Sequence, residues 1–154
     1  MDQQLMNRYE SGVEKLRQAI AGLSEQDLKA APIPGKWSTQ QVVIHLADAE
    51  VASGDRMRRI IAQDQPPLLA WDENLFLRRL FYEQQSAADA VTIIDLTRRQ
   101  LSRVLRKLSD ADWQRTGVHS ERGPLTLTDV LISTTKHLEH HLKFIVEKRE
   151  KLGK

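Results

Sequence analysis

The stretch Lys136-His137-Leu138-Glu139-His140-His141-Leu142 lies inside a segment whose core-facing residues recur every three or four positions. This periodicity predicts a long helix that begins near Thr126 or Thr128 and continues to about Lys151. Its stripe consists of Leu127, Val130, Thr134, Leu138 and Ile145. Residues four positions apart lie one turn apart on the same helix face, so His137 and His141 can hold one metal ion from a single helix.

Three more segments show the same helical periodicity. They span residues 3–22, 38–62 and 87–108. A shorter helix is predicted between the second and third of the long ones, following Trp71 and ending near Gln84. No segment alternates with period two for long enough to predict a strand. The chain is therefore predicted to be all-α, a four-helix bundle with one short extra helix, and residues 1–154 are expected to form a single domain.

The chain also repeats itself. Leu23–Leu28 (Leu-Ser-Glu-Gln-Asp-Leu) is echoed by Leu108–Trp113 (Leu-Ser-Asp-Ala-Asp-Trp), and each is followed by a loop with Pro and Gly and then by a histidine-bearing helix. Those two helices begin alike, because Ser38 with Gln41 forms a capping box that Thr126-x-x-Asp129 resembles. Pseudo-symmetry of this kind predicts that the second and fourth long helices lie together.

His45, on the second long helix, is the candidate for a third metal ligand. A helical wheel places His45 and His137 on the shoulders of their apolar faces and His141 closer to its apolar face. The same wheel turns His140 towards solvent. Three neutral imidazoles leave coordination positions open, as catalytic metal sites require. The alternative for each histidine alone is a boundary residue that hydrogen-bonds to its surroundings.

Two other predictions concern the surroundings of these histidines. Ala49 and Ala52 are small, and they are expected to leave space for a ligand beside the histidine of the second helix. His119 follows Gly117 in a glycine-rich loop, and it is expected on a flexible surface rather than at the site.

Composition narrows the classes of function. The 154 residues include no cysteine, so disulfides are excluded and any thiol chemistry must use a thiol from outside the chain. No run approaches the roughly 18 apolar residues that cross a membrane, and the N-terminus lacks the pattern of a signal peptide, so a cytoplasmic location is expected. The net charge is only +2 and no nucleic-acid-binding motif accompanies the arginines, so nucleic acid is not an expected partner.

Three motifs together resemble one known family. They are Ser38-x-x-Gln41-Val42-x-x-His45-Leu46-Ala47-Asp48-x-Glu50, Pro66-Pro67-x-x-x-Trp71-Asp72-Glu73 and His137-x-x-His140-His141-Leu142. In this order, over essentially the whole chain, they resemble the DinB-like (YfiT-like) four-helix-bundle superfamily. The resemblance implies a divalent metal bound by His45, His137 and His141. It also implies that the chain is a metal-dependent hydrolase or a thiol S-transferase using bacillithiol, mycothiol or glutathione, and that it forms a homodimer.

The leading functional hypothesis is a divalent-metal-dependent thiol S-transferase that acts on a small-molecule substrate. A metal held by three imidazoles lowers the pKa of a coordinated thiol, and the resulting thiolate attacks an electrophile. The first alternative is a hydrolase in which the metal activates water. It needs a carboxylate base, for which the candidates are Asp48, Glu50, Asp72 and Glu73. The second alternative is a non-catalytic stress-response binding module. Imidazole ligands suit zinc, nickel, copper or iron.

The second long helix has apolar residues outside the stripe that would face the core of a single bundle. Val43 and Ile61 lie about 160° from the histidine on the wheel, and Ile44 and Val51 also lie outside the stripe. Together with the family resemblance, this width predicts a two-fold homodimer. The alternative is that the segment 71–82 of the same chain covers the stripe, with Trp71 at the mouth of the bundle and Asp72 capping the short helix.

Overall fold

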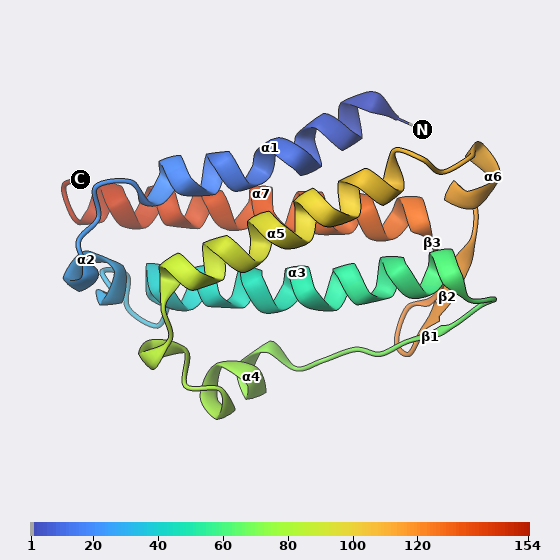
Figure 1. Cartoon of the computed structure of the whole chain (residues 1–154). Coiled ribbons are helices and arrows are strands. Elements are labelled where there is room, and N and C mark those ends of the chain that lie inside the picture. Colours follow the sequence, from blue (N-terminus) through green and yellow to red (C-terminus); the bar gives the residue numbers. More distant parts are fainter. Residues whose placement is uncertain (1) are drawn as a thin grey trace.

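A computed structural model describes residues 2–154 of the chain. Four long helices form a bundle (Figure 1): α1 (Gln3–Ile20), α3 (Thr39–Ala62), α5 (Ala87–Leu105) and α7 (Leu127–Lys151). The predicted four-helix bundle is confirmed, and the predicted ends agree with the structure to within three residues. Each long helix buries one face in the core, as the periodicity of its apolar residues requires.

The order of the helices around the bundle differs from their order in the chain. α3 packs against α5 and α7, and α1 packs against the same two helices, so α1 and α3 lie across the diagonal. α3 and α5 run in the same direction, and the chain between them therefore returns along the length of the bundle (Figure 1). The returning segment contains α4 (Glu73–Arg79) and the short 3₁₀ helix η1 (Tyr82–Gln84). These correspond to the predicted extra helix, and the predicted contact between the two histidine-bearing helices is confirmed.

Side-chain caps define where the helices begin. Ser38 caps α3 in a capping box with Gln41, and Thr126 caps α7 in the same way with Asp129. The repeated sequence gives the same local structure twice. Ser24 and Ser109 form the capping boxes of two short helices, α2 (Glu25–Lys29) and α6 (Asp110–Trp113). Each such cap contributes about 1 kcal/mol and determines where the helix begins.

A small sheet lies where α3 ends and α7 begins (Figure 1). β1 (Pro67–Leu68) pairs in parallel with β2 (Thr116–His119), which pairs antiparallel with β3 (Gly123–Thr126). The expectation that no segment is a strand was wrong, because strands of two to four residues are too short to show an alternating pattern. His119 was also misplaced. Its side chain is buried and accepts a hydrogen bond from the Glu121 amide, since pairing with β1 brings the glycine-rich loop onto the bundle.

Part of the apolar surface of α3 that lies outside the predicted stripe is buried in the core of the same chain. Val43 and Ile44 are fully buried within this chain, in a cluster that includes Tyr82 of η1 and packs against Phe76 of α4. The returning segment therefore covers these two residues, as the alternative interpretation supposed, whereas Val51 remains exposed. None of the helices in residues 2–154 is both long and apolar enough to cross a membrane.

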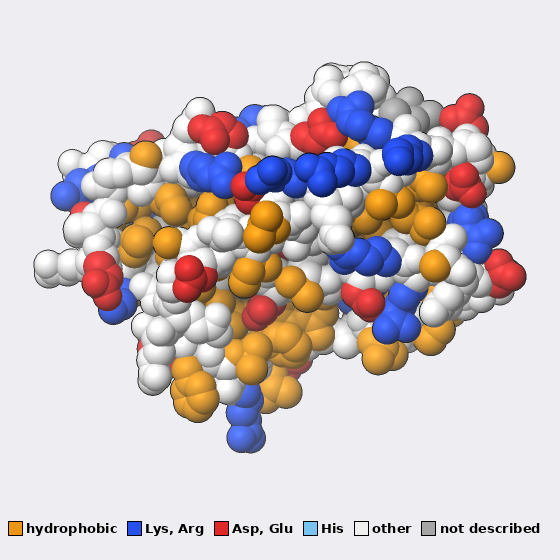
Figure 2. All heavy atoms as spheres, viewed as in Figure 1, with side chains coloured by type: hydrophobic (Ala, Val, Ile, Leu, Met, Phe, Trp, Pro, Cys, Tyr) orange, Lys and Arg blue, Asp and Glu red, His pale blue; other side chains and the backbone are white. Residues whose placement is uncertain are grey.

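The face shown in Figure 2 carries a row of basic side chains with acidic ones beside it. Ion pairs between neighbouring helices include Arg17 of α1 with Asp95 of α5, and Arg106, directly after α5, with Glu10 of α1. Such pairs at solvated helix faces contribute little to stability, whereas Arg98 of α5 is buried. Hydrophobic side chains gather over the lower part of the same face (Figure 2). Between residues 75 and 96, the exposed large hydrophobic side chains are those of Leu75, Leu80, Phe81, Ile93 and Leu96.

Candidate metal centre

Three histidines from two helices meet inside the bundle. The Nε2 atom of His137 lies 3.1 Å from Nε2 of His45 and 3.1 Å from Nε2 of His141. One nitrogen from each ring can be chosen so that all three lie within 4.8 Å of one another. The structure thus brings together the three histidines that the sequence singled out. It leaves His140 exposed to solvent, as predicted.

This arrangement fits a divalent cation better than a set of hydrogen bonds. A neutral imidazole has one N–H, so Nε2 of His137 can make at most one of its two contacts as donor. A cation, in contrast, accepts a lone pair from each of the three nitrogens. Nitrogen ligands about 2.1 Å from a tetrahedral ion lie roughly 3.4 Å apart, close to the 3.1 Å found here. Three ligands leave at least one position for an exogenous molecule.

Burial keeps the three imidazoles neutral. It lowers the pKa of His45 to about 4 and that of His141 to about 3, and repulsion from the neighbouring histidines adds to both shifts. Burial also lowers the pKa of His137, with smaller contributions from His140 and Arg98. At neutral pH the lone pairs are therefore free to bind a metal without competition from protons.

Aromatic side chains, rather than hydrogen bonds, orient two of these rings. The buried Nδ1 atoms of His45 and His141 have no hydrogen-bond partner among residues 2–154. Ligating histidines usually donate this second N–H to an orienting group. Here Trp37 packs edge-on against His45 with ring centroids 5.2 Å apart, Trp71 lies 5.6 Å from it, and Phe144 lies 5.9 Å from His141. No pattern in the sequence indicated that Trp37 or Phe144 lies at the site.

Of the four candidate carboxylates, Glu73 lies at the histidines. Its Oε2 is 3.7 Å from Nε2 of His45, and its side chain is 54% exposed and therefore accessible to solvent. Asp72 instead caps α4 by accepting hydrogen bonds from two backbone amides, as the alternative interpretation supposed. Asp48 accepts a hydrogen bond from the Tyr82 hydroxyl, and burial raises the pKa of this carboxyl group.

Glu50, the remaining candidate, belongs to a buried polar network. One oxygen accepts a hydrogen bond of 2.6 Å from the Tyr9 hydroxyl, and the other accepts two from the Arg98 guanidinium, at 2.9 and 2.7 Å. Arg98 also donates to the Tyr9 carbonyl. These bonds link α1, α3 and α5, and both Glu50 oxygens are already engaged. We therefore assign Glu50 a structural role.

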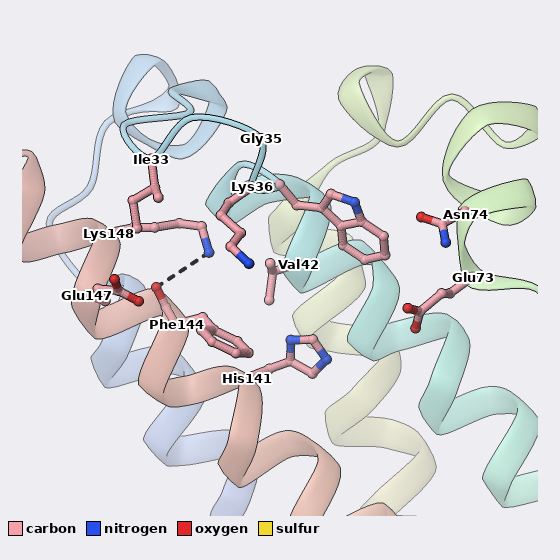
Figure 3. Close-up of a pocket in the computed structure, with 11 residues that line it drawn as sticks. Ile33, Gly35, Lys36, Val42, Glu73, Asn74, His141, Phe144, Glu147 and Lys148 are labelled. Atoms are coloured by element: carbon pink, nitrogen blue, oxygen red, sulfur yellow. Dashed lines mark hydrogen bonds between the residues drawn. The ribbon is translucent and has the colours of Figure 1, made fainter.

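Two cavities flank the histidine cluster. One, of about 290 Å³, has His141 in its wall together with Trp37, Phe144 and two lysines (Figure 3). The other, of about 220 Å³, has His45 and His137 in its wall and also includes Ala49 and Arg56. Ala49 therefore leaves space beside His45, as predicted. Glu73 lines both cavities, so one carboxylate can reach molecules on either side of the cluster.

Comparisons with known proteins identify the family and the fold of the chain. The sequence matches the DinB superfamily over residues 8–145. A protein of Oceanobacillus iheyensis named "Putative metal-dependent hydrolase OB0782" is 25% identical over 140 residues, which are 91% of this chain and 81% of that protein. The solved structure of YfiT from Bacillus subtilis superposes with a TM-score of 0.90 at 23% identity, covering 97% of this chain and 86% of that one. A mycothiol-dependent maleylpyruvate isomerase superposes with a TM-score of 0.72 at 11% identity, covering 91% and 58%. Both superpositions show a shared fold.

Proposed function

This chain belongs to the DinB superfamily, and we propose that it is a divalent-metal-dependent enzyme whose metal is held by His45, His137 and His141. The convergence of their three nitrogens supports this assignment. Relatives along most of the chain are named as metal-dependent hydrolases, which also supports a metal-dependent activity. Among residues 2–154 the cluster offers three ligand nitrogens, which leaves at least one coordination position for a substrate.

The reaction that we favour is transfer of a low-molecular-weight thiol to an electrophilic small molecule. The observation that carries this choice is the pair of cavities on either side of the histidines, which share Glu73. A transferase must hold two organic molecules at once, whereas a hydrolase holds one and a water molecule. The thiol must come from outside, since the chain has no cysteine. A solved structure of the same fold belongs to a mycothiol-dependent enzyme, which is consistent with this choice.

The bound metal would supply Lewis acidity, which lowers the pKa of a coordinated thiol towards neutrality. The remaining functions, proton transfer and substrate binding, belong to residues of the protein. In this proposal Glu73 accepts the thiol proton, and Trp37 and Phe144 form part of the wall of the larger cavity. The sulfur then forms a bond to a carbon of the electrophile. The bond from that carbon to its leaving group breaks, and the leaving group departs with the electron pair and takes up a proton.

Hydrolysis is the second candidate, and the position of Glu73 favours it. A carboxylate 3.7 Å from a ligand nitrogen can act as general base towards water as well as towards a thiol. In that reaction one cavity would hold the substrate and the other would hold solvent.

One assay separates these functions. Metal-loaded protein is incubated with glutathione, bacillithiol or mycothiol and with monobromobimane, and conjugation is measured by fluorescence. Hydrolysis of p-nitrophenyl acetate is measured in parallel without thiol. We expect metal-dependent conjugation that His137→Ala abolishes. Metal-dependent ester hydrolysis without conjugation would favour the hydrolase. If wild type and His137→Ala are equally inactive in both assays, the non-catalytic binding module is favoured.

A further inference from the structure

Lys148 carries a buried positive charge that has no anionic partner. Its side chain is only 3% exposed, yet no carboxylate of the described residues 2–154 lies within ion-pair distance of its Nζ atom. The hydrogen bond found for this ammonium group goes to the Phe144 carbonyl of the same helix, at 3.4 Å, longer than an ordinary bond of this type. Burying a charge without a partner of opposite charge is unfavourable in free energy, so an anion bound here would stabilise the ammonium group.

A second cation points into the same space. Lys36, from the loop before α3, and Lys148, from α7, both line the larger cavity, and their amino groups approach one another at one end of it (Figure 3). The charge of Lys36 adds to burial in lowering the pKa of Lys148. Glu147 lines the same cavity and partly offsets the two positive charges. This end of the cavity therefore has a net charge of about +1, suited to one carboxylate group.

The residues that line the rest of the cavity indicate the chemistry of the remaining part of such a ligand. Trp37 and Phe144 line the cavity, and His141 lies near its other end with Glu73 (Figure 3). Lys148 follows His141 by two helical turns, and its side chain reaches back to the carbonyl of Phe144, three residues after His141. The ammonium group therefore lies about one helical turn, or roughly 5 Å along the axis, beyond the backbone of His141. A molecule that reaches from the metal to Lys148 therefore has its anionic group several bonds away from its reacting atom.

We propose that Lys148 and Lys36 bind the carboxylate of a small-molecule substrate whose apolar middle lies against Trp37 and Phe144. This inference rests on the proposed function, because it takes the reacting end of the molecule to lie at the three histidines. It names the substrate class, an acid with its carboxylate remote from the reacting atom, and it makes Lys148 a residue that determines specificity.

Hexanoate is a suitable probe, and its binding to the full chain can be measured by isothermal titration calorimetry with and without bound zinc. We expect Lys148→Met to weaken hexanoate binding about tenfold or more, since a hydrogen-bonded charge is lost. Lys143→Met is the matched control, because Lys143 is an exposed lysine of the same helix outside the cavity, and it should leave binding unchanged. Hexanol should bind wild type and Lys148→Met equally weakly. Inorganic phosphate should bind more weakly than hexanoate.

Lys148→Met is expected to fold, because it replaces an unpaired buried charge with an apolar side chain of similar length. Lys36→Met, in an exposed loop, provides a second variant, and it should also weaken hexanoate binding. The proposal is overturned if hexanoate does not bind wild type, or if both lysine variants bind it as wild type does. It is also overturned if His137→Ala abolishes hexanoate binding while Lys148→Met does not, since the carboxylate then goes to the metal. If hexanoate binds through the lysines but no metal binds, the proposed function fails and the carboxylate site remains.

Discussion

His45 and His137 are 92 positions apart in the sequence, and their Nε2 atoms lie 3.1 Å apart where α3 packs against α7. The third nitrogen, from His141, comes from the same helix as His137, one turn further on. The cluster therefore exists only when the two helices are packed together. A metal bound there would favour the folded state, because the unfolded chain cannot bring the three ligands together.

We predict that the wild-type chain binds one divalent metal ion and that His137→Ala or His141→Ala abolishes this binding. Each substitution removes one of three ligands and leaves two, too few for a stable site. Elemental analysis of protein purified without a histidine tag gives the stoichiometry. His140→Ala is the matched control from the same helix, because His140 is exposed and should not change metal content. Loss of the metal in His140→Ala but not in His141→Ala would contradict the assignment.

Acid should destabilise the metal-free protein in a defined range. A histidine has a pKa of about 6.5 in the unfolded chain, whereas the pKa of His45 is about 4 and that of His141 about 3 in the fold. Between these values the unfolded state binds more protons, so stability falls as the pH is lowered from about 6.5 to 4. Urea unfolding at several pH values measures this slope, and His45→Asn should flatten it. Greater stability at pH 5 than at pH 7 would contradict the prediction.

The long helices could be predicted because each leaves several signals in the sequence. α3 begins with the capping box of Ser38 and Gln41 and then continues with helical periodicity for seven turns or so. The strands leave no comparable signal. β1 has two residues, and its pairing of Leu68 with His119 joins positions about 50 residues apart, which no local pattern contains. The same pairing explains why His119 was placed wrongly.

The histidines could be predicted because residue type and spacing together indicate their chemistry. His137 and His141 are one turn apart, and His45 lies at the edge of the apolar face of a second predicted helix. The family resemblance then indicated the same three residues. The four candidate carboxylates could not be ranked in this way, because no pattern in the sequence distinguishes the environment of Glu50 from that of Glu73. Only the fold shows that Glu50 is bonded to Arg98 while Glu73 lies beside His45. The cytoplasmic location and the homodimer stay predictions.

We predict that Glu50→Gln destabilises the protein by about 3–5 kcal/mol without changing its metal content. The substitution leaves the buried Arg98 charge without its counterion. Urea unfolding gives the loss. Glu10→Gln is a matched control, since it breaks another two-bond Arg–Glu contact between helices, but at the surface, where about 1 kcal/mol or less is expected. Equal losses in the two variants would show that burial of the Arg98 pair is unimportant.

We propose that the chain forms a homodimer, and light scattering at micromolar concentration tests this. Phe81, between α4 and η1, and Leu96, on α5, are among the exposed apolar side chains, and they supply surface that a second copy can cover. The expected mass is twice the 17.7 kDa of one chain. Leu96→Glu should shift the dimer towards monomer, whereas Gln100→Glu, one turn further along α5, should shift it less. A wild-type protein that scatters as a monomer would contradict the proposal.

Glu73→Gln should lower the rate of the metal-dependent reaction about 10²- to 10⁴-fold while metal content stays at the wild-type level. Glu73 lies 3.7 Å from a ligand nitrogen without being part of the histidine cluster, so its removal takes away a general base but not the metal. Raising the pH should restore part of the rate, because solvent hydroxide then removes the proton that Glu73 would accept. Asp72→Asn is the matched control, since the adjacent side chain caps α4 and asparagine keeps the cap. Equal activity of Glu73→Gln and wild type would show that neither thiol nor water loses its proton to this carboxylate.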